Sequence, residues 1–187
     1  MNITLNRKLL ILFAALLLFM TIYSSYKKDT ELTAVQWVEK GNGFQTSNKL
    51  DSAIVAYSKA LELDPQMRDV YVQRGQAYTL AKQYDSAIED FTKVLEFDPL
   101  NAEMYWLRGT AYAGKGQHQL AIDEYTKTLR VNPKMVMAYW NSALSYEKLK
   151  LNHLAVQSYH NFARFAPPEH PNVELARKRV EELGKNK

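Results

Sequence analysis

The segment Arg68–Pro99, RDVYVQRGQAYTLAKQYDSAIEDFTKVLEFDP, decides the fold of this chain of 187 residues, because three related segments lie beside it. Four of the six prolines are spaced 34 residues apart, at Pro65, Pro99, Pro133 and Pro167. A fixed period of roughly 20–50 residues is typical of a repeat array, in which one supersecondary unit is stacked on the next. We therefore predict four units, over residues 34–67, 68–101, 102–135 and 136–169.

Aligning the units at these prolines brings further positions into register, so the units share one internal structure. Three positions are aromatic in every unit, one is small, and one is alanine throughout. The aromatic positions are Trp37, Tyr71, Tyr105, Tyr139, then Phe44, Tyr78, Tyr112, Tyr146, then Tyr57, Phe91, Tyr125, Tyr159; the small position is Gly41, Gly75, Gly109, Ala143, and the alanines are Ala53, Ala87, Ala121, Ala155.

Each unit is predicted to be a pair of helices. In the second unit, apolar and small residues recur at helical spacing within residues 69–80, and in a second helix Ala87 and Phe91 share a face. Gly75 costs about 1 kcal/mol relative to alanine inside a helix, so we expect the paired helix to approach closely at Ala87 and offset this cost. Asp98 is expected to end the second helix, since a residue before proline is disfavoured in the α region.

At these positions the sequence resembles the tetratricopeptide repeat, whose first helix has an aromatic–Gly–Tyr pattern and whose second has Ala–aromatic–Pro. The resemblance covers Ala34 to about Glu169 without an insertion. It implies an all-α fold, a right-handed α-solenoid of four helix-turn-helix units in which each pair buries its apolar face only against its neighbours. The chain departs from the family where a leucine often precedes the glycine; the residues here are Lys40, Arg74, Arg108 and Ser142.

The two ends of the array have signals of their own. Thr33 and Gln36 form a candidate capping box at the start of the first helix. A terminal repeat needs a polar outer face, so we predict that the tail over residues 170–187 is an amphipathic capping helix. Its apolar stripe is Val173, Ala176, Val180 and Leu183.

Residues 1–26 predict a membrane anchor or a signal segment. The run Leu9–Ile22, LLILFAALLLFMTI, is almost wholly apolar and follows two basic residues. A secretory signal needs small residues at its cleavage site, and only Ser24 offers one. We therefore favour an uncleaved hydrophobic helix that anchors the chain to a membrane through residues 9–26, followed by a short linker over residues 27–33.

The positive charges around this run predict its orientation. Arg7, Lys8 and the N-terminal amine precede it, and Lys27 and Lys28 follow together with Asp29. The positive-inside tendency slightly favours a cytoplasmic N-terminus. The repeats are then expected on the periplasmic or extracytoplasmic side.

Charge and cysteine content exclude several classes of function. The net charge of +4 is confined to the ends, because residues 34–169 carry 15 basic and 15 acidic side chains. The body has no excess charge to attract phosphate, so we expect no nucleic-acid partner. The chain contains no cysteine, which removes disulfides, thiolate metal sites and thiol nucleophiles.

The sequence predicts no catalytic, cofactor or metal site. Gly114 and Gly116 flank Lys115 in a turn between helices, without the spacing of a phosphate-binding loop. The histidines form no HExxH motif and have no second ligand at helical spacing. They are His118, His153, His160 and His170. We therefore expect no enzymatic activity and no cofactor.

The resemblance also implies where a ligand would bind. In the tetratricopeptide repeat family the first helices line a concave groove, and its positions carry over by their place in each repeat. Trp106 and Trp140 recur on this row and would anchor a segment with large apolar side chains, unless both only pack between neighbouring first helices. The predicted groove residues are Val38, Asn42, Asp69, Val72, Gln76, Glu103, Trp106, Thr110, Trp140 and Leu144.

One sub-family is argued against by its ligand residues. Its members hold the C-terminal carboxylate of a chaperone with Lys, Asn and Arg side chains from three successive repeats. The corresponding residues here are Val38, Asn42, Gln73, Glu103 and Leu107, of which only Asn42 matches. Glu103 would repel a carboxylate. We therefore expect no carboxylate clamp for chaperone tails.

These features together predict a membrane-anchored scaffold or adaptor that binds a protein or peptide segment in its groove without catalysis. Because one repeat array serves many unrelated partners, two alternatives stay open. One is a secreted or periplasmic assembly factor or co-chaperone for envelope complexes, with the apolar run cleaved. The other is a self-associating structural oligomer, whose groove is filled by a neighbouring copy.

Overall fold

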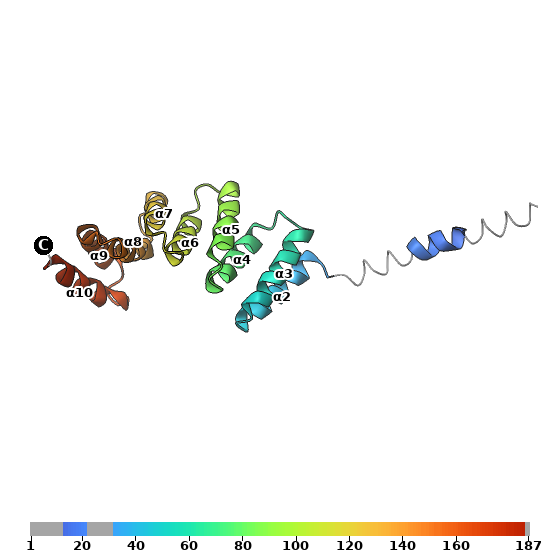
Figure 1. Ribbon diagram of the computed structural model, residues 1–187, viewed down its shortest axis with the longest axis horizontal. Helices are drawn as coiled ribbons and strands as arrows, with labels where there is room; N and C mark the ends of the chain where they lie inside the picture. Colours follow the sequence, from blue (N-terminus) through green and yellow to red (C-terminus); the bar gives the residue numbers. More distant parts are fainter. Residues whose placement is uncertain (1–12, 22–31, 186–187) are drawn as a thin grey trace, which may run out of the picture.

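The computed structural model describes residues 13–21 and 32–185, and within these residues the chain is helical and contains no strand. From residue 34 on, the helices form pairs that follow one another along the long axis of the molecule (Figure 1). The pairs are α2 (Ala34–Thr46) with α3 (Leu50–Leu63), α4 (Arg68–Leu80) with α5 (Tyr84–Phe97), α6 (Ala102–Gly114) with α7 (His118–Val131), and α8 (Val136–Lys148) with α9 (Asn152–Phe165), followed by α10 (Asn172–Gly184).

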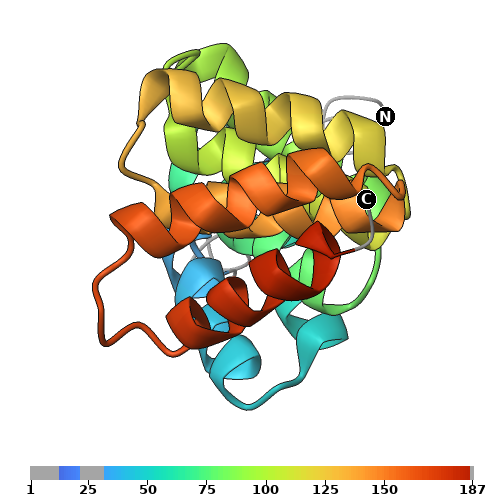
Figure 2. The ribbon, with the colours of Figure 1, turned by 90° about the vertical axis from the view of Figure 1, so that its left-hand side faces the viewer.

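The pairs stack into an α-solenoid, which confirms the predicted all-α fold. Each helix packs against the next one along the chain, and first helices of neighbouring pairs also touch, α4 with α6 and α6 with α8. Figure 2 views the stack from its C-terminal end, where α10 lies beside α9. The hydrophobic core is accordingly divided into successive clusters along the stack rather than gathered at one centre.

The Asp–Pro dipeptides shape the loops between pairs. Asp64 and Asp98 leave the α region, with φ of −140° and −138°, as the sequence predicts. The carboxylate of Asp64 accepts a hydrogen bond from the backbone N–H of Gln66 at 3.0 Å. Tyr71 of the next pair donates its hydroxyl to the carbonyl of Pro65 at 3.3 Å. Tyr71 therefore ties the loop to the following helix, and its ring also packs against the neighbouring core cluster.

The turns inside the pairs have a periodic feature that the sequence analysis did not predict. Each contains one residue in the left-handed region, with φ between 55° and 82°. A residue with a Cβ atom pays roughly 1–2 kcal/mol for this conformation, whereas glycine does not. The four residues are Asn48, Lys82, Gly116 and Lys150, again 34 residues apart.

The small residue in each first helix makes room for an aromatic ring. A methyl group on Gly75 would lie 2.7 Å from Cε1 of Phe91, whose side chain is fully buried. The equivalent glycines of the first and third units face Tyr57 and Tyr125 in the same way. The predicted close approach is present, but its partner is the ring of the paired helix rather than Ala87.

The arginine before this glycine forms an ion pair that joins three helices. Arg74 donates from Nε and Nη2 to the two carboxylate oxygens of Asp90, at 2.9 and 2.7 Å, and from Nη1 to the hydroxyl of Ser58 on α3, at 3.0 Å. Arg108 repeats the arrangement with Glu124 and with a threonine of α5. Burial raises the pKa of Asp90 in spite of its bonds to Arg74. The departure from the family pattern in these two units therefore has a structural cause.

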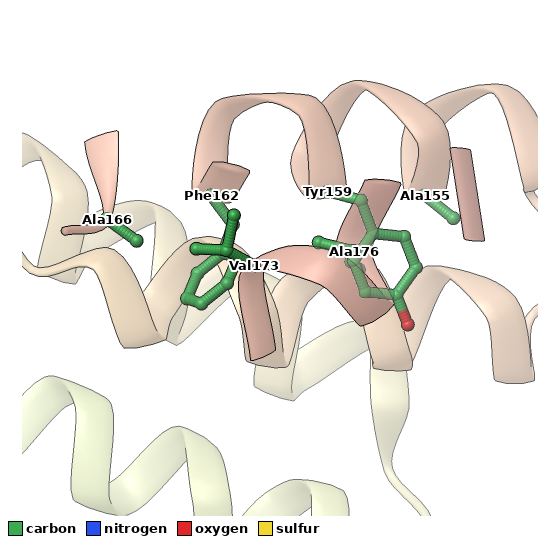
Figure 3. Packing of buried hydrophobic residues seen from close by; sticks show 7 residues of the cluster. Ala155, Tyr159, Phe162, Ala166, Val173 and Ala176 are labelled. Carbon is green, nitrogen blue, oxygen red and sulfur yellow. The ribbon is translucent and has the colours of Figure 1, made fainter. Parts of the chain in front are cut away.

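Both ends of the array agree with the sequence. The hydroxyl of Thr33 accepts a hydrogen bond from the backbone N–H of Gln36, and the Gln36 side chain accepts one from the backbone N–H of Thr33 at 2.9 Å, which completes the capping box. At the other end, Val173 and Ala176 of α10 are buried in a cluster with Phe162 of α9 (Figure 3). The predicted apolar stripe is thus the side of α10 that packs.

The predicted N-terminal membrane span is contradicted. In the described part of the chain, no helix is long and apolar enough to cross a bilayer. The described portion of the apolar run is a helix over residues 13–21. Residues 9–12 and 22–26 of the predicted span lie outside the described residues. The localisation inferred from this span, with the repeats held on the periplasmic or extracytoplasmic side, is therefore corrected.

Candidate peptide-binding surface

The ten predicted groove residues all lie on the first helices of the pairs, α2, α4, α6 and α8. We call the surface that these ten residues form the first-helix surface. Asn42, Asp69, Glu103 and Leu144 are exposed there, and the others are half-buried. Two of them, Thr110 and Leu144, line one pocket, and Trp140 and Leu144 line another. The predicted row is therefore brought together mainly over α6 and α8.

The central pocket has a volume of about 380 Å³ and spans three first helices. Thr79 of α4, Thr110 of α6, and Asn141 and Leu144 of α8 line it, and Tyr125 of α7 also contributes. Its walls are mostly apolar, with a few polar groups. This combination is typical of sites that bind a side chain or a small ligand.

The hydroxyl of Tyr125 is held between two of these walls. Burial raises the pKa of Tyr125 to about 12, against the lowering effect of hydrogen bonds with the Thr110 and Asn141 side chains. Tyr125 is therefore neutral at physiological pH and cannot act as a base. Its position fixes α6 against α8 under the pocket.

The C-terminal pocket, of about 360 Å³, lies between α8 and α10. Trp140 and Tyr159 form its aromatic wall, and Leu175 and Arg179 of α10 face them. Leu144 and Lys148 of α8 line both pockets and so form the ridge between them. The sequence analysis treated α10 only as a cap and missed this contribution.

A polar network joins the helices around the C-terminal pocket. Tyr159 donates its hydroxyl to Oε1 of Glu147 at 2.6 Å, and Arg179 donates to the same carboxylate through Nε at 3.1 Å and through Nη2. Burial raises the pKa of Glu147, but the bonds from Arg179 and Tyr159 outweigh it and leave this pKa below its ordinary value. Glu147 is therefore ionised at neutral pH, and its charge is balanced by Arg179.

The two tryptophans are half-buried, which is intermediate between the two roles that the sequence left open. The ring of Trp140 lies 5.3 Å from that of Tyr159 and 5.2 Å from that of Phe162, between centroids. Trp106 packs on the cluster of Tyr125 and Ala138, and among the described residues its buried Nε1 has no hydrogen-bond partner. Both indoles contribute to packing, while Trp140 also lines a pocket.

The N-terminal half of the predicted row is not part of either pocket. Val38, Asp69 and Glu103 are absent from the residues that line the two pockets. Asn42 has a structural bond instead, because its side-chain oxygen accepts the hydroxyl of Tyr57 at 2.8 Å. The sequence analysis assigned no ligand-binding role to Tyr125 and Tyr159, which it read only as a periodic aromatic column. It missed Leu175 and Arg179 because α10 lies outside the repeats and no periodic position marks them.

The described residues contain no group of three or more His, Asp or Glu side chains that could hold a metal ion. His118 borders the central pocket at the first position of α7, and its buried Nδ1 has no partner among the described residues. Within the described part of the chain, no hydrogen bond through this Nδ1 therefore joins His118 to a nucleophilic side chain.

Comparison with known families identifies the repeats. A family model described as "TPR repeat" matches residues 41–81 and 75–116, and one described as "Tetratricopeptide repeat" matches residues 107–169. Together they span well over half of the chain. No curated protein matches it significantly.

Solved structures share the fold. The crystal structure of MamA is 25% identical, with a TM-score of 0.68 over 81% of this chain and 86% of that one. A tetratricopeptide repeat protein from Parabacteroides merdae is 19% identical, with a TM-score of 0.71 over 82% and 60%. The first TPR domain of Spaghetti (RPAP3), bound to the HSP90 peptide SRMEEVD, is 24% identical, with a TM-score of 0.58 over 63% and 94%.

Proposed function

Because the chain belongs to the tetratricopeptide repeat family, we propose that it is a non-catalytic adaptor that binds a protein or peptide segment on its first-helix surface. Within this proposal the repeats are the four units over residues 34–67, 68–101, 102–135 and 136–169, and the tail over 170–187 caps them. Arrays of this kind offer a preformed surface, which lowers the ordering cost of binding.

The observation that supports the proposal is the central pocket. Three successive first helices contribute to it, and Leu144 stands at its edge with 43% of its surface exposed. An exposed leucine beside a mostly apolar hollow has no role in the hydrophobic core. It is suited to contact an apolar side chain of a partner.

The Spaghetti domain binds a peptide on the same type of fold, which supports the choice of a peptide as ligand class. The chaperone-tail peptide itself is not proposed as the ligand, since only Asn42 matches the clamp residues and Asn42 is bonded to Tyr57.

A library of short random peptides, displayed on phage and selected on the full-length chain, tests the proposal. We expect selected peptides to lose at least tenfold in affinity on Leu144→Asp. The matched control is Leu120→Asp, because Leu120 on α7 is 44% exposed and lines neither pocket. Failure to enrich any peptide, or equal binding by both variants, would refute a peptide site on this surface.

A further inference from the structure

We propose that the partner segment spans both pockets and has an acidic residue between two apolar ones. Lys148 recognises the acidic residue, and Leu175 in the C-terminal pocket contacts one of the apolar ones. This inference rests on the proposed function and specifies its ligand. It assigns α10 a role in recognition in addition to its packing role.

The two pockets are adjacent, and one ridge separates them. Leu144 and Lys148 line both, and they are one turn apart on α8. Residues four apart lie on the same face of a helix. A segment that places one apolar side chain in each pocket must therefore pass over this pair, and its middle residue lies against them.

The charges along the ridge determine the middle residue. Three ionised side chains line the pockets, namely Glu147, Lys148 and Arg179. Glu147 is bonded to Arg179, and Arg179 also donates to Glu182 at 2.6 Å. Lys148 is exposed and forms no ion pair with another described residue, although its charge helps lower the pKa of Glu147. Lys178 lies 3.8 Å from Glu182, so Arg179 and Lys178 together balance the two carboxylates and the charge of Lys148 is left over. This positive charge on the ridge favours a carboxylate on the partner.

The C-terminal pocket is suited to an apolar side chain of the partner. Trp140 and Tyr159 pack edge to face and present an aromatic wall, and Leu175 of α10 faces them with 46% of its surface exposed. The hydrogen bond from Arg179 to Glu147 links α10 to α8 beside this pocket. Because this pocket needs both helices, α10 is part of the binding surface in this proposal.

The same peptide selection supplies the test. We expect the enriched peptides to contain an acidic residue flanked by apolar residues, and their affinity to fall as salt is raised, since a rim charge is screened. Lys148→Gln should weaken binding about threefold to fivefold and Lys148→Glu about tenfold or more. Lys134→Glu is the matched control, because Lys134 is an exposed loop lysine outside both pockets.

Leu175→Ala tests the role of α10 separately. We expect about a fivefold loss of affinity, with Leu63→Ala as the control for removal of an exposed leucine at the end of another helix. Urea unfolding of each variant shows whether the fold is retained.

The outcomes separate the two proposals. If peptides bind and Leu144→Asp abolishes binding, but no acidic residue is enriched and Lys148→Gln binds like the wild type, the adaptor function stands and this inference is wrong. If Leu175→Ala also binds normally, α10 has no part in recognition. If no peptide is selected, both proposals fail together.

Discussion

Two helical glycines should respond in opposite ways to the same substitution. Gly75 and Gly43 both lie inside first helices, and alanine is intrinsically better than glycine there by about 1 kcal/mol. A Cβ atom at Gly43 meets nothing within 4 Å, so Gly43→Ala should stabilise the protein by about 0.5–1 kcal/mol. At Gly75 the Cβ atom would stand 2.7 Å from Cε1 and 3.0 Å from Cζ of Phe91.

The ring of Phe91 is fully buried, so it can shift away from an added methyl group only if its neighbours in the core also move. Overpacking of this kind costs about 1–3 kcal/mol, which equals or exceeds the helix-propensity gain of about 1 kcal/mol, so Gly75→Ala should lower the free energy of unfolding by up to about 2 kcal/mol. Urea unfolding of the two single variants measures the difference.

The double variant Gly75→Ala/Phe91→Leu shows whether the ring is responsible. In the Phe91→Leu background the added methyl should cost less than it does in the wild type, which gives a positive coupling between the two sites. If Gly75→Ala stabilised the protein as much as Gly43→Ala does, the ring would not be the reason for glycine at this position.

Three further predictions concern the turn, the C-terminal network and the ligand. Lys150→Gly should raise the free energy of unfolding by up to about 1 kcal/mol in urea, because Lys150 has φ of 60°; a loss of stability would show that its side chain compensates for the strain. The pKa of Glu147 is lower in the folded state than in the unfolded one, so its stabilisation is complete above the unfolded value and is lost as pH falls from roughly 5 to 3. The urea midpoint of Arg179→Met should therefore vary less over that range than the wild-type midpoint; parallel curves would mean that the ion pair does not contribute. By fluorescence anisotropy, labelled SRMEEVD should not bind the full-length chain at micromolar concentration, since Glu103 opposes a carboxylate; saturable binding would restore the chaperone-tail class.

The fold was predictable because its period is visible without any structure. The 34-residue spacing of Pro65, Pro99 and Pro133 already implies loops at fixed intervals, and the structure places the end of a second helix just before each. The capping box at Thr33 was also readable, because both of its partners lie within one helical turn.

Side-chain contacts between different helices could not be predicted from the sequence. Arg74 and Asp90 lie 16 residues apart on different helices, and nothing in a single repeat shows that they meet. For the same reason, the sequence analysis predicted Ala87 as the residue that approaches Gly75, whereas the structure places Phe91 there. Of the predicted groove residues, Thr110, Trp140 and Leu144 line pockets. Leu175 and Arg179 line the C-terminal pocket only because α10 folds back beside α9, which no periodic position indicates.

The guanidinium groups of Arg74 and Arg108 have a mechanical consequence for the stack. Each links its own pair to the preceding one, through Ser58 and Thr92. At the seam between α7 and α8 the equivalent residue is Ser142, which donates to the carbonyl of Ala138 in its own helix at 2.7 Å and, among the described residues, does not bond to α7. We therefore expect the array to bend most readily at this seam. The central pocket lies across it, so bending there would widen or narrow the pocket, and amide hydrogen exchange should be faster at the ends of α7 and α8 than along α3 and α4.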